Sequence, residues 1–108
     1  MQYTHTSEHE VKNIIRQTYI MAALHLNIPH PQLEDSFVLH EEIKKRNEKL
    51  FSLLSSFSEA YLTFYYTAAT FTAHKKSALL SDVEKQKIQE LFEEKEKIKA
   101  EVLKEIAA

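Results

Sequence analysis

The stretch that decides the fold is residues 36–76, SFVLHEEIKKRNEKLFSLLSSFSEAYLTFYYTAATFTAHKK. It contains no Pro or Gly, and its apolar residues follow a seven-residue repeat, which is typical of a helix packed against other helices. The inner positions are Leu39, Ile43, Leu50, Leu53, Phe57, Ala60, Phe64, Thr67 and Phe71, with Arg46 as an interruption. The repeat predicts one helix over 36–76, about 60 Å long. Weak bends are expected at the 55–58 or 67–72 runs, because Ser and Thr compete for backbone hydrogen bonds.

Two shorter helices are predicted, one on each side of this stretch. Ser7 with Glu10, and Ser81 with Glu84, have the spacing of a capping box at a helix start. The first helix, 8–27, ends before Pro29. The linker 28–35, IPHPQLED, then leads to a cap at Asp35 or Ser36. The last helix covers 82–106. The expected inner stripes are Val11, Ile14, Thr18, Met21, His25 and Ile28 on the first helix, and Ile88, Leu91, Ile98 and Val102 on the last.

These elements predict a single all-α domain over 1–108, in which a long central helix is flanked by two shorter ones. The flanking helices, about 30 and 39 Å long, would cover one side of the long helix when laid end to end. The other side would then need a second chain. We therefore expect a helical bundle completed by dimerisation, with the seven-residue repeat packing as in a coiled coil.

Composition excludes several classes of function. The chain has 108 residues, a formal charge of −2, no Gly and no Cys. Without Gly we expect no tight hairpin turns and no Gly-rich phosphate loops. Without Cys there is no disulfide, zinc-thiolate site or Cys nucleophile. The absence of a basic excess argues against nucleic-acid binding.

The sequence favours a cytoplasmic protein that does not insert into a membrane. The N-terminal stretch MQYTHTSEHEVKN lacks the basic and apolar regions of a secretory signal. Residues 50–73 are long enough to span a bilayer and carry one formal charge, at Glu59. However, that Glu and the many Ser and Thr residues lower the hydropathy of the segment. We interpret it as a largely buried helix.

A candidate partner-binding surface lies on the outer face of the long helix, opposite the repeat. It consists of Phe51, Leu62, Tyr65, Tyr66 and Ala69. Residues 61–72, YLTFYYTAATFT, lack the polar face that a monomer would need there. Two interpretations are compatible with this pattern. The segment is the buried central helix or self-association surface of the bundle, or part of it is an exposed aromatic groove for another helix or peptide. Both hold if self-association covers only one side.

We expect no metal, cofactor or catalytic residue. His5 and His9 share a helix face, but the remaining ligands of a metal site are missing, as is the Glu-x-x-His pattern of di-iron bundles. His25 and His74 fall on inner stripes and are expected to be hydrogen-bonded residues of the core or its edge. An alternative is an enzyme or small-ligand binder with a pocket between helices, for which Arg16, Arg46, His25 and His74 are the candidate polar groups.

Residues 39–61, LHEEIKKRNEKLFSLLSSFSEAY, are similar in apolar spacing to the long helix of the small helical chorismate mutases. The resemblance implies a dianion held by helix-borne arginines, but this chain has His40 and Phe57 at those places and Asn47 in place of the usual Asp. Because the charge-assisted contacts to a dianion are lost, we do not expect that activity. The size and layout also resemble bacteriocin-immunity proteins and secretion chaperones, by fold-level analogy.

The sequence therefore predicts a non-enzymatic helical adaptor or chaperone-like protein. It would act through self-association, as a homodimer, and through a helix-face interface with a protein or peptide. The alternatives are a ligand-binding or enzymatic bundle and a bacteriocin-immunity-like protein.

Overall fold

Four α-helices and a short 3-10 turn make up the computed structural model over the residues that it describes, 7–73 and 80–107. The elements are α1 (Glu8–His25), η2 (Pro31–Leu33), α2 (Ser36–Arg46), α3 (Glu48–Thr72) and α4 (Asp82–Ala107). These ranges contain no strand, so the predicted all-α class is confirmed. The predicted starts of the first and last helices, at 8 and 82, are also confirmed.

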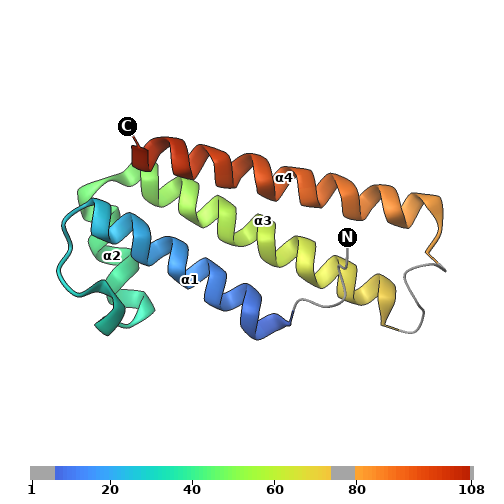
Figure 1. Ribbon diagram of the computed structural model, residues 1–108, viewed down its shortest axis with the longest axis horizontal. Coiled ribbons are helices and arrows are strands. Elements are labelled where there is room, and N and C mark those ends of the chain that lie inside the picture. Colours follow the sequence, from blue (N-terminus) through green and yellow to red (C-terminus); the bar gives the residue numbers. More distant parts are fainter. Residues whose placement is uncertain (1–6, 74–79, 108) are drawn as a thin grey trace.

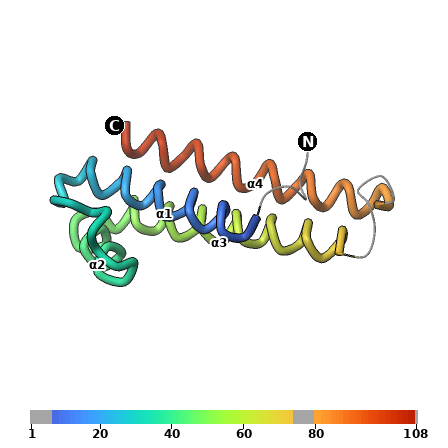
Figure 2. The backbone as a smooth tube through the Cα atoms, turned by 60° about the horizontal axis from the view of Figure 1, so that its bottom comes forward, coloured from blue at the N-terminus to red at the C-terminus, as the bar shows by residue number. Residues whose placement is uncertain are grey.

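The helices form an elongated bundle of 47 × 25 × 18 Å with α3 at its centre (Figure 1). α1 and α4 both pack on α3 and run antiparallel to it. α2 lies at the end where α3 begins and packs on both α1 and α3. Figure 2 shows α2 standing apart from the layer of the three longer helices. Each of the other helices therefore contacts α3.

The prediction of three helices, with one unbroken helix over 36–76, is wrong, because the helix is interrupted at Asn47. The backbone of Asn47 is extended, and its N–H donates to the Ile43 carbonyl at 2.9 Å at the end of α2. Its side-chain Oδ1 accepts from the Leu50 N–H at 3.0 Å and so caps α3. One residue thus ends a helix and starts the next. α3 continues through 55–58 without interruption and ends at Thr72.

The break at Asn47 removes the geometric argument for a second chain. A second chain was expected because a continuous helix of about 60 Å could not be covered on both sides by the two shorter helices. In the structure α2 turns back and packs against α1 and α3, with Leu39 and Ile43 fully buried. Dimerisation therefore stays a prediction without this support.

The chain reverses between α1 and α2 without glycine. Asn27 takes the left-handed conformation, with φ of 62°. The Ile28 N–H donates to the Ala23 carbonyl at 3.0 Å, and the Asn27 N–H to the Leu24 carbonyl at 3.1 Å. These two bonds are the Schellman motif, in which Asn is the usual replacement for Gly. His30, with φ of 48°, makes a second left-handed turn directly before η2.

The buried face of α1 is rotated from the predicted one. Ile14, Met21 and His25 were expected inside and are exposed. The buried residues of this helix are Val11, Ile15, Thr18, Tyr19, Ala22 and Ala23. Because the helix is apolar on nearly all sides after Tyr19, periodicity alone could not choose between the two faces. Of the predicted bundle core, Ile43, Leu50, Phe57 and Phe64 are buried, and Leu53 and Phe71 are half-buried.

The core consists of two clusters. The larger one joins all four helices and includes Ile43, Phe57 and Val102. The smaller one joins α3 with α4 and contains Phe64, Ala68, Leu80 and Ile88. Lys95 lies between them, seven residues after Ile88 and seven before Val102 on the inner stripe of α4. This lysine was not among the predicted inner residues, yet it is only 7% exposed.

Candidate functional site

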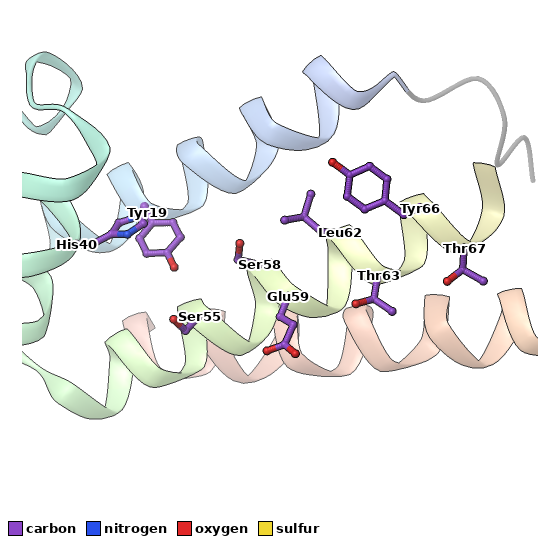
Figure 3. Close-up of a pocket in the computed structure, with 9 residues that line it drawn as sticks. All are labelled: Tyr19, His40, Ser55, Ser58, Glu59, Leu62, Thr63, Tyr66 and Thr67. Atoms are coloured by element: carbon purple, nitrogen blue, oxygen red, sulfur yellow. The ribbon is translucent and has the colours of Figure 1, made fainter. Parts of the chain in front are cut away.

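A groove runs along the side of α3 that the other helices leave open (Figure 3). We call it the α3 groove. It has a volume of about 630 Å³ and is lined by Tyr19, His40, Ser55, Ser58, Glu59, Leu62, Thr63, Tyr66 and Thr67. The α3 members recur at steps of three and four residues, so they share one face of that helix. Six of the nine lining residues are Ser, Thr or Tyr, which makes the groove polar but almost uncharged.

A stacked pair closes one end of the groove. The ring centres of Tyr19 from α1 and His40 from α2 lie 4.1 Å apart in a stacked pair. The ring centre of Phe51 from α3 lies 6.2 Å from that of His40, in an edge-on arrangement. The Tyr19 hydroxyl shares a hydrogen bond with Ser55, while burial raises its pKa. Burial, with a smaller contribution from the Arg16 charge, lowers the pKa of His40. Both rings are therefore neutral at pH 7.

The other end is fixed by a polar contact between α3 and α1. The Tyr66 hydroxyl donates to Glu8 Oε1 at 3.2 Å, and the same carboxylate oxygen pairs with Lys12 Nζ at 2.8 Å. The hydrogen bond and charge of Lys12, followed by the bond from Tyr66, lower the pKa of Glu8. Tyr66 is still 45% exposed. Its ring thus offers a contact surface whose orientation is set by the hydroxyl.

A second hollow of about 300 Å³ lies on the α4 side of the same face. We call it the α4 hollow. It is lined by Ser56, Glu59, Ala60 and Thr63 of α3 and by Leu91, Glu94 and Ile98 of α4. Glu59 and Thr63 line both concavities, so they form the ridge between them. Carboxylates line these two concavities, and among the described residues neither wall includes a Lys or Arg.

The structure separates the five residues predicted to bind a partner. Leu62 and Tyr66 line the α3 groove. Tyr65 is half-buried against the larger core cluster, and Phe51 packs there too, with Lys44 Nζ 5.9 Å from its ring centre. Ala69 is exposed on α3 outside the lining of the groove. Within 61–72, the exposed residues are Thr63, Tyr66, Ala69 and Thr70, so this segment does have a polar face, although an uncharged one.

Sequence reasoning missed most of the groove. Ser55, Ser58, Glu59, Thr63 and Thr67 share a face with Leu62 and Tyr66, and this spacing was readable from the sequence. Tyr19 and His40 come from other helices, and no local pattern connects them to α3. Their position follows from the chain reversal at residues 26–35.

Of the residues suggested for a ligand-binding or enzymatic site, the three that the structure describes, Arg16, Arg46 and His25, do not meet. Arg16 donates to the carbonyls of Gln32 and Glu34 and to the Ser36 hydroxyl, and it holds the connector before α2. Arg46 pairs with Glu42 on its own helix, and His25 is exposed at the end of α1. His74, like His5, lies outside the described residues. Within 7–73 and 80–107, no three His, Asp or Glu side chains come close enough to hold a metal ion.

Comparisons of the chain with known protein families, curated proteins and solved structures found no match. Among the helices described, none combines the length and the apolar character needed to cross a membrane.

Proposed function

We propose that this chain is a non-enzymatic interaction protein that holds a helix of another protein on the open face of α3. The observation that supports this is the charge of that face. Glu59 lines both concavities and Glu94 lines the α4 hollow, and no Lys or Arg stands among the described residues of either wall. A partner helix that presents Lys or Arg to Glu59 complements this face, because opposite charges at an interface fix partner choice and orientation.

The shape of the α3 groove suits a helix. Residues 55–67 run straight for about 18 Å along α3. Small Ser and Thr side chains allow the backbone of a second helix to come close, at the 8–10 Å or so typical of helix packing. Leu62 and the exposed Tyr66 ring supply apolar contact at the centre and at one end.

Glu59 argues against a second copy of this chain as the occupant. A two-fold dimer is built from the same patch on both subunits. If two α3 grooves faced each other, the Glu59 carboxylates of both copies would lie near the axis and repel. A partner of different sequence avoids this repulsion.

The test is site-specific photo-crosslinking, with a photoreactive phenylalanine analogue in place of Thr63. The captured segment is then made as a peptide, and its affinity is measured for Glu59→Lys and for the matched charge change Glu101→Lys, at an exposed position of α4 outside both concavities. We expect a helical segment with a basic residue, bound at least about tenfold more weakly by Glu59→Lys alone, which is 1.4 kcal/mol. Equal effects of both variants, or capture of a second copy of the chain, contradict the proposal.

Self-association is a second candidate, favoured by a different surface. Ile14, Met21 and Leu24 are 37%, 41% and 59% exposed and lie on neighbouring positions of the outer face of α1. Light scattering over a range of concentrations measures the solution mass. If the protein dimerises through α1, Met21→Lys makes it monomeric while Glu101→Lys does not.

A further inference from the structure

A small cavity between α1, α2 and α3 lies next to the α3 groove and differs from it in charge. It has a volume of about 130 Å³, room for several water-sized groups. Its polar lining is Lys12, Arg16 and Tyr19 from α1, Ser36 and His40 from α2, and Ser58 from α3. We call it the basic cavity. Tyr19, His40 and Ser58 also line the α3 groove, so the two are neighbours.

Three bases, Lys12, Arg16 and His40, line this cavity, and no Asp or Glu stands among the described residues of its wall. The Tyr19 phenol is neutral at pH 7, since burial raises its pKa. The Arg16 guanidinium is held in place by the Gln32 and Glu34 carbonyls, at 3.3 and 2.9 Å, and by the Ser36 hydroxyl at 3.3 Å. These acceptors are neutral. Within the described ranges no carboxylate lies in ion-pair distance of Arg16, so its charge is positioned but not neutralised.

The Arg16 charge acts on the pKa of the neighbouring His40. After burial, the Arg16 charge is the second cause that lowers the pKa of His40. The other groups facing His40 are the Tyr19 ring from α1 and the Phe51 edge from α3, and neither carries a charge at neutral pH. Lys12 lies at the exposed mouth of the cavity, where it pairs with Glu8 at 2.8 Å. The interior thus has an uncompensated positive potential.

Hydrogen bonding points to the same class of ligand. The guanidinium has N–H groups beyond those in its three bonds, and the hydroxyls of Ser36, Ser58 and Tyr19 can all donate. A ligand surrounded by donors and positive charge is best satisfied when it only accepts and is itself negative. We infer that the basic cavity binds a small free oxyanion, such as a sulfate, phosphate or carboxylate ion. This goes beyond the docking of a helix in the α3 groove and does not depend on it.

The test uses the wild-type protein and two probes, sulfate and acetate, each against chloride at equal ionic strength. The pKa of each His is followed by NMR. An anion bound beside His40 stabilises its charged form, so we expect a saturable rise in the pKa of His40 of about 1 unit. The exposed His25 and His30 serve as internal controls and should not follow the same saturation curve.

Variants assign the effect to the cavity. Arg16→Gln should abolish the saturable rise, whereas Arg46→Gln, an exposed arginine on α2, should leave it intact. Because Arg16 also holds the connector, Lys12→Gln is the second variant, and it should weaken binding severalfold without loss of fold. The inference is overturned if neither probe shifts His40, if His25 and His30 shift in parallel, or if the removal of Arg16 or Lys12 changes nothing. No partner is present in this experiment, so its failure says nothing about helix docking.

Discussion

The Nζ atom of Lys95 lies 4.4 Å from the centre of the Phe92 ring, inside the bundle. Tyr61 and Phe64 of α3 face the same ammonium, at 4.7 and 5.5 Å to the ring centres, and a Glu96 carboxylate oxygen lies 3.6 Å from it. Ring faces attract a cation, but burial removes it from water. Burial is the largest effect on Lys95 and lowers its pKa. The lysine thus fills a position that an apolar residue would occupy at lower cost.

Replacement of this lysine by an apolar residue of similar length should stabilise the protein. We expect Lys95→Met to raise the free energy of unfolding by about 1 kcal/mol at pH 7, because an apolar side chain has no desolvation cost. Because the pKa of Lys95 is lower in the folded than in the unfolded chain, the unfolding free energy of the wild type rises as pH increases toward about 10. The stability difference between Lys95→Met and the wild type should therefore shrink over this range. Urea unfolding at pH 7 and above measures both effects. A lower stability of Lys95→Met would show that the ring contacts outweigh desolvation.

Phe57 should be among the most sensitive positions of the core. It is 1% exposed in the larger cluster. Phe57→Ala should cost about 3–5 kcal/mol, since it removes buried contacts and leaves a cavity. Phe37→Ala is the matched control, because Phe37 is 76% exposed and its loss should change stability by less than about 0.5 kcal/mol. Similar midpoints of urea unfolding for the two variants would contradict the packing described.

Acid should destabilise the fold through His40. Its pKa is lowered in the folded state, so the unfolded chain takes up the proton at higher pH. Stability is therefore complete above the ordinary His value of about 6.5 and is lost as pH falls below it. We expect wild type to lose more stability than His40→Gln between about pH 6.5 and 5. The exposed His25→Gln should behave as wild type, and an equal pH dependence in all three proteins would refute the prediction.

The two left-handed residues should respond differently to glycine. His30 has a side chain that disfavours φ of 48°, whereas Asn tolerates this region well. His30→Gly relieves that cost but adds freedom to the unfolded chain, so we expect a gain of about 0.5 kcal/mol. Asn27→Gly should be neutral or slightly destabilising. Thermal unfolding of the two variants checks the difference in sign.

The starts of the first and last helices were predictable because capping residues within the first turn mark them. The Ser81–Glu84 capping box forms with both of its bonds, Ser81 N–H to Glu84 Oε1 at 2.9 Å and Glu84 N–H to Ser81 Oγ at 3.1 Å. The Ser7 hydroxyl likewise accepts from the Glu10 N–H at 3.1 Å. Such signals act within one turn of a helix, so tertiary packing does not overrule them easily.

The break at Asn47 was missed because the seven-residue repeat continues on both sides of it. Two local signs were present. Arg46 interrupts the inner stripe, and Asn followed by Glu48 is a common helix start. The repeat outweighed them because apolar spacing does not report a change of direction between two helices. The α3 groove was only partly predictable for a related reason, since it combines one face of α3 with side chains from α1 and α2.

The division of the core at Lys95 also sets where the bundle opens first. The larger cluster draws on all four helices, while the smaller one holds only the end of α3 and the start of α4 with Leu80. Sub-global opening begins where few apolar contacts must be broken. Amide hydrogens in the last turns of α3 and the first turns of α4 should therefore exchange with solvent well before those near Phe57 and Val102. Unfolding is thus expected to start where the end of α3 meets the start of α4. These two helix ends separate while the larger cluster, which joins all four helices, remains packed.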